Sequence, residues 1–385
     1  MIKLIRRRAM AALLTAALAS TAALAQETVK VGLLLTYSGP AALTGLHSDD
    51  TIKAFQQRFG QMAGDKKIEF VKRDTTGPNP EVGKRLVQEL IVREKVQLLI
   101  GPDFTPNVLA AAPLITEAKL PTIITGASTA GIVGEKSPYY LRTFFSNPQV
   151  TVPMAQYAYR TGSRKLFVVV ADFAPGHEVE AQFTKAFQAA GGAIAGTLRV
   201  SVRNPEFSSH MQRIKDAAPD AVFVFLAMGE APVQFLKAYS DSGLKKSGIR
   251  LLGTSELTDE LILDAAGDTA IGVLTSGMYS ADHDSPLNRQ TVADLAPFKH
   301  TPVVPIWDAL QLIYDGVAAQ KGSRFDGEKF LAFAKGRKFE SPRGPIAISA
   351  ANGDIVQNTY IRRVERRDGR LVNVEIETLS PPGLR

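Results

Sequence analysis

The stretch 96–129 constrains the fold of this chain most, because it reads as strand, helix and strand in direct succession. An apolar run at 96–100 stops at a Gly-Pro pair, as expected of a strand that is buried on both faces. A helical run follows at about 108–118, and a second apolar run covers 122–125. Two strands joined by a helix in this way are typical of a parallel sheet in an α/β fold.

Both strands of this unit end in loops that carry polar side chains. Asp103, Thr105 and Asn107 follow the first strand, and the sequence Gly-Ala-Ser-Thr at 126–129 follows the second. In an open α/β sheet both loops lie at the carboxyl edge, where ligands bind. Helix N-termini at this edge offer unpaired N–H groups and a partial positive charge, so an anion such as a carboxylate is the expected ligand. The alternative is a plain strand–helix–strand unit in which these side chains only cap helices.

Residues 1–25 are predicted to be a cleaved secretory signal peptide. Four basic residues within the first eight positions precede an apolar segment at 9–24, and the Ala-Leu-Ala at 23–25 is a small-x-small cleavage signal. The alternative, a retained membrane anchor, is disfavoured because the apolar segment is short and rich in alanine. We therefore expect a periplasmic protein whose mature chain begins at Gln26.

The mature chain is expected to be only weakly basic. The net charge of +7 for the 385 residues includes the four basic residues of the leader, which leaves +3 for the rest. The basic stretch 362–370 is predicted to be a solvated hairpin, and no nucleic-acid partner is expected. The chain has no Cys, which excludes a disulfide framework, so stability must come from burial. Because a single core for a chain this long is unusual, two domains are expected.

A strand at 29–36, a helix at 49–59 and a strand at 67–73 are predicted near the start of the mature chain. The same order is repeated from residue 165 onward, as a strand at 165–171, a helix at 178–190 and a strand at 193–200. The strand ends LLIG and IITGAS of the first half correspond to VFVFLAMG and RLLGTS of the second half. We therefore predict an α/β fold of two Rossmann-like lobes, each with a parallel sheet flanked by helices.

Each predicted lobe is assembled from two separate stretches of the chain. The predicted boundaries are 26–146 plus 277–341 for the N-terminal lobe and 147–276 plus 342–385 for the C-terminal lobe. The chain is expected to cross between the lobes at three hinge segments, namely 146–148, 272–279 and 341–345. Such segments absorb the dihedral changes that domain closure requires.

Sequence signatures of catalysis are incomplete. Residues 126–130 resemble a nucleophile elbow, but Ala130 stands where a glycine is needed, so Ser128 is better explained as a hydroxyl that faces a ligand. The pair at 177–178 lacks the second His of a zinc-protease helix. The Asp-His-Asp at 282–284 is more simply a solvated loop than a metal site. With five His and no Cys, no metal or other cofactor is implied.

Six segments, which together extend over nearly all of the mature chain, occur in the order and spacing of one known family. These segments are VKVGLLLTYSGPAALTG, LLIGPDFTPNVLAAAPL, LPTIITGAST, ADFAPGHEVEAQFTKAFQAAGG, PDAVFVFLAMG and LLGTSELTDE. They resemble the periplasmic solute-binding proteins of branched-chain amino-acid ABC transporters. The resemblance implies the type I periplasmic-binding-protein fold, in which two lobes joined by three crossover segments close around a ligand and present it to a membrane permease.

The resemblance also implies where the carboxylate of a ligand is held. Thr105 in the first central loop and the segment Ala127, Ser128 and Thr129 in the second match the family's carboxylate-binding positions. Thr129 is the expected side-chain contact and Ala127 the expected backbone contact.

Further cleft positions follow from the same resemblance. Phe173 matches an aromatic position that caps the ligand, and either Ser255 or Glu256 matches the acidic position that holds an α-amino group. Met228 and Trp307 fall near cleft positions, although each is equally compatible with an ordinary core residue.

The predicted function is that of an extracytoplasmic solute-binding protein of an ABC importer. The expected ligand is a small carboxylate, either a hydrophobic or branched-chain amino acid or an aromatic acid. Thr44 stands where binders of aliphatic amino acids often carry an aromatic residue, which implies a larger or more polar pocket. A monomer is expected. The alternatives are a sensory binding protein of the same fold and an exported hydrolase that uses Ser128.

Overall fold

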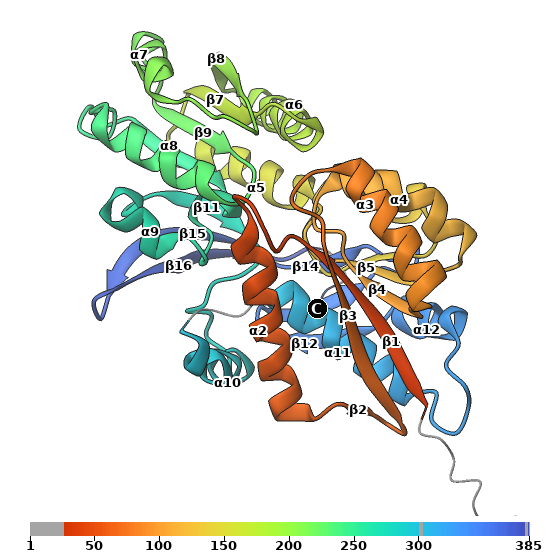
Figure 1. The fold of residues 1–385 in the computed structure, drawn as a ribbon. Coiled ribbons are helices and arrows are strands. Elements are labelled where there is room, and N and C mark those ends of the chain that lie inside the picture. The colour runs from red at the N-terminus through yellow and green to blue at the C-terminus, as the bar shows by residue number, and fades with distance from the viewer. Residues whose placement is uncertain (1–26, 300–302, 382–383, 385) are drawn as a thin grey trace, which may run out of the picture.

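The computed structural model describes residues 27–299, 303–381 and 384 (Figure 1). The predicted leader and the cleavage site before Gln26 lie outside the described residues. Two lobes, each with a mostly parallel sheet covered by helices, confirm the predicted type I periplasmic-binding-protein fold. Within the described part of the chain, no helix has the length and apolar character that crossing a membrane requires.

The N-terminal lobe is built mainly from the first third of the chain. Its first elements are β1 (Thr28–Leu35), α2 (Ala42–Phe59), β2 (Met62–Ala63), β3 (Lys66–Asp74), α3 (Pro80–Glu89), the π-helical turn η1 (Leu90–Glu94), β4 (Leu98–Ile100), α4 (Thr105–Glu117), β5 (Thr122–Ile124), the irregular turn η2 (Ile132–Lys136) and β6 (Tyr140–Arg142). They form a six-stranded sheet in the order β2-β3-β1-β4-β5-β6, parallel except for the β2–β3 pair.

The C-terminal lobe repeats this wiring. Its elements are α5 (Asn147–Arg160), β7 (Lys165–Ala171), α6 (Ala174–Ala189), β8 (Ala193–Val200), α7 (Ser208–Asp216), β9 (Ala221–Phe225), α8 (Glu230–Asp241), β10 (Arg250–Thr254), η3 (Ser255–Thr258), α9 (Leu263–Ala266), η4 (Gly267–Ala270) and β11 (Leu274–Gly277), followed much later by β15 (Thr359–Arg367) and β16 (Arg370–Leu379). The sheet order is β16-β15-β11-β10-β9-β7-β8, and the pairs β11–β15 and β15–β16 are antiparallel.

The chain returns to the N-terminal lobe between β11 and β15. The elements of this return are α10 (Pro286–Leu295), η5 (Ala296–Phe298), α11 (Val304–Ala318), α12 (Gly327–Ala334), β12 (Lys338–Ser341), β13 (Gly344–Ile348) and β14 (Ile355–Gln357). The last three strands form a small antiparallel sheet of their own.

The packing of this small sheet bears on one expected boundary. The side chains of Ile346, Ile348 and Ile355 pack in the same apolar cluster as β1 and α11, so residues 344–357 belong to the N-terminal lobe. We therefore propose that the third crossing lies near residue 358 rather than at 341–345. The apolar run of β13 resembles that of any buried strand, and only its packing partners identify the lobe to which it belongs. We propose a C-terminal lobe that resumes at β15.

Burial on both faces explains the continuous apolar runs of the central strands. In β1, Val31 and Leu33 pack in the cluster under α11, whereas Leu34 packs in the cluster under α3 and α4. In β4, Leu98 and Leu99 divide between the same two clusters. Successive side chains point to opposite faces of a sheet, so a strand with helices on both sides needs apolar residues at every position.

Candidate functional site

The loops that follow the parallel strands of the two lobes face one another across a cleft. Three adjoining cavities lie between them, with volumes of about 800, 310 and 740 Å³ that include open solvent. Met228 and Glu256, both from the C-terminal lobe, border all three. This is the carboxyl edge of both sheets, where open α/β folds bind ligands.

The smallest of the three, here called the anion cavity, lies between two helix N-termini. Thr105 and Phe104 at the start of α4 line it from the N-terminal lobe, and Phe173 and Pro175 at the start of α6 line it from the other lobe. Neither helix has a side-chain cap, so its first N–H groups are not satisfied in that way. The Ser128 side chain adds a hydroxyl to this cavity. Helix N-termini and hydroxyls at one place are suited to an anion. The carboxyl groups of Asp103 and Glu256 also line this cavity, and burial raises their pKa values to about 6 and about 7.

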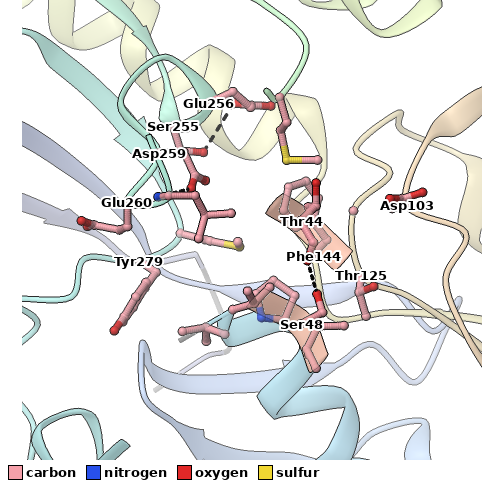
Figure 2. Close-up of a pocket in the computed structure, with 18 of the residues that line it drawn as sticks. Thr44, Ser48, Asp103, Thr125, Phe144, Ser255, Glu256, Asp259, Glu260 and Tyr279 are labelled. Atoms are coloured by element: carbon pink, nitrogen blue, oxygen red, sulfur yellow. Dashed lines mark hydrogen bonds between the residues drawn. The ribbon is translucent and has the colours of Figure 1, made fainter. Parts of the chain in front are cut away.

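The first of the three, here called the main cavity, is apolar along its sides. Leu35 and Phe144 from the N-terminal lobe and Met228 and Met278 from the opposite side contribute to this lining. The Phe144 ring is stacked on Phe145 with centroids 4.2 Å apart, which holds it in place. Figure 2 shows Phe144 facing the loops of the C-terminal lobe across this cavity. The apolar sides are suited to a flat hydrocarbon group.

One side of the main cavity is acidic. Ser255, Glu256, Asp259 and Glu260 line it from the C-terminal lobe, opposite Thr44 and Phe144 (Figure 2). Burial raises the pKa of Glu256 and the pKa of Glu260 to about 7 each, and it also raises the pKa of Asp259. This side therefore offers carboxyl groups that accept or donate hydrogen bonds near neutral pH.

Two further charged groups border the main cavity. The Arg362 guanidinium, 2% exposed, donates to the Tyr279 carbonyl and, at 3.1 Å, to the Thr275 hydroxyl. Burial lowers the pKa of Arg362, while the nearby carboxylates raise it. On the N-terminal side, Asp103 accepts a hydrogen bond from the Thr36 N–H at 2.9 Å, and burial raises the pKa of Asp103 to about 6.

The rims of the two lobes touch. The Ala130 N–H donates to Glu178 Oε1 of α6 at 3.1 Å. A Cβ placed on Gly229, whose φ is 120°, would lie 2.7 Å from the Pro40 carbonyl oxygen. The backbones therefore meet too closely at Gly229 for any larger residue. The rims of the cleft are in contact.

Comparison with known proteins agrees with this geometry. A sequence profile of the family described as "Periplasmic binding protein" matches residues 28–370. The chain belongs to this family. The predicted resemblance is thereby confirmed, as is a solute-binding role in the periplasm.

Individual relatives of this periplasmic binding protein are similar over their whole length. The "Leu/Ile/Val-binding protein homolog 6" of Brucella melitensis is 39% identical over 385 residues, with 98% of each chain covered. The solute-binding protein of an ABC transporter from Rhodopseudomonas palustris BisB5, solved with 3,4-dihydroxybenzoic acid, is 41% identical with a TM-score of 0.88. A second R. palustris structure, solved with 4-hydroxybenzoate, has the same identity and TM-score. Both cover 92% of this chain and 97% of their own.

The structure brings seven of the eight predicted ligand-binding residues to the cleft of this binding protein. The lining residues are Thr105, Ala127, Ser128 and Phe173 in the anion cavity, Ser255 in the main cavity, and Met228 and Glu256 in all three. The eighth, Thr129, lines none of the cavities. Its hydroxyl lies 3.1 Å from that of Thr105, and its carbonyl accepts from Arg142. Thr129 therefore contacts Thr105 in the first central loop rather than the three cavities.

Two residues whose roles were open in the sequence are now placed. Trp307, 2% exposed, packs in the core of the N-terminal lobe, with its ring 5.0 Å from that of Phe55 in an edge-on contact. Thr44 borders the main cavity from the first turns of α2, which begins seven residues earlier than the sequence predicts. The expected caps of α4 are wrong: its N-cap is Phe104, and the Asn107 amide donates instead to the Gly77 carbonyl.

Arg362 is the clearest residue that sequence reasoning missed. The stretch 362–370 does form the expected hairpin, β15–β16, but β15 pairs with β11 on its other edge. Arg362 thus lies on a strand inside the sheet and is buried against Gly277, rather than solvated. Other missed lining residues are Ser48, Thr125, Phe144, Asp259, Glu260, Met278 and Tyr279. Thr125, Asp259 and Glu260 stand in segments that carry the resemblance, but no residue pattern marked any of the seven as lining the cleft.

The polar loop at 282–284 is occupied by ion pairs. Asp282 pairs with Arg367, His283 with Glu375 and Asp284 with Arg289. Among the residues that the structure describes, no group of three or more His, Asp or Glu side chains is arranged to hold a metal ion.

Proposed function

We propose that this periplasmic binding protein captures an aromatic carboxylic acid with a ring hydroxyl and delivers it to the membrane permease of an ABC importer. The proposal rests on the order in which cavities of different lining follow one another along the cleft. An anion cavity between helix N-termini adjoins a cavity with apolar sides, and one side of that cavity is acidic.

The proposed carboxylate position is the anion cavity. The partial positive charge at the starts of α4 and α6 favours an anion there, and Thr105 and Ser128 carry hydroxyl groups that can donate to it. Ala127 is proposed as a backbone contact in the same cavity, and Phe173 as the aromatic cap.

The proposed ring position is the main cavity, with the ring hydroxyl directed at its acidic side. Phe144 and Met228 offer apolar and aromatic surface for a ring. A phenol donates a hydrogen bond that Glu256 or Glu260 can accept. The two R. palustris proteins that are 41% identical were solved with hydroxylated benzoates, which supports the same ligand class here.

A branched-chain amino acid is the second candidate. The same acidic side would accept hydrogen bonds from an α-ammonium group, and the B. melitensis relative carries a Leu/Ile/Val-binding name. The apolar sides fit either an aliphatic or an aromatic group. In an amino acid the ammonium group lies next to the carboxylate, whereas in a hydroxybenzoate the hydroxyl lies on the ring. Unfolding measurements with a panel of ligands therefore separate the two candidates.

Thermal unfolding with a panel of candidate ligands tests the proposal. At about 100 times the dissociation constant, 4-hydroxybenzoate should add roughly 2.7 kcal/mol to the unfolding free energy, which raises the melting temperature by several degrees. Benzoate should bind more weakly because it leaves the acidic side unpaired, and 4-hydroxybenzamide should bind weakly because it lacks the anion. Stabilisation by leucine but not by 4-hydroxybenzoate would overturn the aromatic assignment in favour of the second candidate.

Replacement of Thr105 by valine should weaken binding of an anionic ligand more than the same change at Thr129. Hydrogen bonds to charged groups contribute about 1.5–3 kcal/mol, so Thr105→Val should raise Kd by roughly one to two decades. Thr129→Val removes only the partner of the Thr105 hydroxyl and should cost less. Titration calorimetry on both variants checks this order. Parent-like binding by Thr105→Val would place the anion elsewhere in the cleft.

The remaining parts of the proposal concern the protein's setting. We propose that the exported chain begins at Gln26, acts as a monomer and releases its ligand chemically unchanged. Intact mass of the secreted form, light scattering and chromatography of ligand recovered after incubation test these points in turn. Conversion of the ligand would favour the exported-hydrolase alternative.

A further inference from the structure

Arg142 is buried directly behind the loop that borders the anion cavity. It lies at the end of β6 with its side chain fully enclosed. Its Nη1 donates to the carbonyls of Ala127 at 3.2 Å and Thr129 at 2.9 Å. Its Nε and Nη2 bind the Asp354 carboxylate at 2.7 and 2.5 Å. One guanidinium therefore joins the ligand loop to a carboxylate more than 200 residues away in sequence.

The two carbonyls that accept from Arg142 determine where the next N–H groups point. In a planar trans peptide the C=O and the following N–H point in opposite directions. The Thr129 carbonyl faces Arg142, and the Ala130 N–H on the other side of the same peptide donates to Glu178 of the opposite lobe at 3.1 Å. By the same geometry, the Ser128 N–H points away from the guanidinium. Ala127 and Ser128 both line the anion cavity.

The small third sheet supplies the carboxylate that holds Arg142. Asp354 lies in the turn between β13 and β14, and this turn packs against β6. The Arg142 N–H donates to the Gly353 carbonyl at 3.1 Å, and a Cβ on Gly353 would lie 2.9 Å from the Tyr140 carbonyl oxygen. The close approach explains the glycine, whose φ is 82°. A guanidinium that is paired with a carboxylate and donates four hydrogen bonds, as Arg142 does, is the state in which a buried charge is tolerated.

We propose that Arg142, held by Asp354, is a positioning residue that orients the 127–130 loop both for the ligand anion and for contact with the opposite lobe. An unpositioned loop would have to be ordered at each binding event, which lowers affinity. The part that concerns the anion rests on the proposed function. The part that concerns the loop conformation does not.

The test combines Arg142→Lys and Asp354→Asn with two measurements on the full mature chain. Hydrogen–deuterium exchange at 126–131 in the ligand-free protein should be faster in both variants, because the loop carbonyls lose their fixed donor. The Kd for 4-hydroxybenzoate should rise, on the order of tenfold for Arg142→Lys and less for Asp354→Asn. The Asp354→Asn variant keeps the shape of the turn. It therefore tests the same loop even if Arg142→Lys fails to fold.

Arg73→Gln is the matched control. Arg73 is also in the N-terminal lobe and binds two carboxylates, Glu89 and Glu94, but it touches no part of the loop. It should lower the melting temperature without changing exchange at 126–131 or the Kd. If Arg142 has a purely structural role, its variants will also lower the melting temperature without changing exchange at 126–131 or the Kd. That result would overturn the proposal.

The two measurements also separate this inference from the proposed function. If the parent protein does not bind 4-hydroxybenzoate, the aromatic assignment fails, and exchange at 126–131 alone decides the role of Arg142. Parent-like exchange in both variants overturns the proposal whatever the ligand is.

Discussion

Replacing Arg343 with methionine should lower the free energy of unfolding by about 3–5 kcal/mol, the cost of leaving one partner of a buried ion pair without the other. Arg343 and Asp308 are 1% and 0% exposed at their side chains, with Nη2 and Oδ2 2.6 Å apart. In the variant, the Asp308 carboxylate would stay buried without a cation. Denaturant unfolding of the ligand-free protein at neutral pH measures the loss.

Because of its position, the loss of the Arg343 side chain should affect lobe closure as well as stability. Its guanidinium donates to the Thr143 carbonyl, beside the first crossing, and approaches Met278 Sδ at 2.8 Å, beside the second. Its own carbonyl accepts from the Tyr360 hydroxyl at 2.6 Å, beside the third. One residue thus touches residues in or beside all three proposed crossings. We expect the variant to change the ligand-induced compaction seen by small-angle scattering.

Two controls make the Arg343 result interpretable. The double variant Asp308→Leu/Arg343→Met removes both charges, so it should recover a large part of the lost stability. Arg160→Met breaks an ion pair with Glu377 in which the arginine is 57% exposed, and it should cost no more than about 1 kcal/mol. A loss for Arg343→Met as small as that of the surface control would show that the buried pair contributes little.

Replacing Glu256 with glutamine should remove one part of the pH dependence of stability between about pH 4.5 and 7, a window in which Glu260 and Asp103 also titrate. Burial raises the pKa of Glu256 to about 7 from its ordinary value of 4.5. Below pH 4.5 the carboxyl is protonated in both states. As the pH rises to 7, the unfolded chain releases this proton first, so stability falls by about 3 kcal/mol for this group and then levels off.

Denaturant unfolding at pH 4.5 and pH 8 checks the Glu256 prediction. The parent should lose stability between the two, and Glu256→Gln should lose less because its side chain does not titrate. Glu69→Gln, which removes a carboxylate from the exposed face of β3, controls for the change in net charge. Equal pH dependence in the parent and Glu256→Gln would mean that Glu256 is ionised in the folded protein at acid pH.

The lobes and their central strands could be predicted because their sequence pattern has a local cause. The runs at 165–171 and 193–200 are predicted and observed with identical bounds as β7 and β8. A strand buried on both faces needs apolar residues at every position, and this requirement is visible in a single segment. The start of α2 was missed because its first turns carry Thr44 and Ser48, polar residues that line the cleft rather than the core.

The sequence by itself determined the two-lobed α/β fold and the loops at strand ends that line the cleft. Only the tertiary structure decided which side chains share the cleft, placing Phe144, Glu260 and Arg362 from three distant segments around one cavity. It also assigned β13 and β14 to the N-terminal lobe and Arg142 to the back of the ligand loop. The physical reason is that strand and helix patterns follow from neighbours in the chain, whereas the contacts of a buried charge depend on how whole lobes pack.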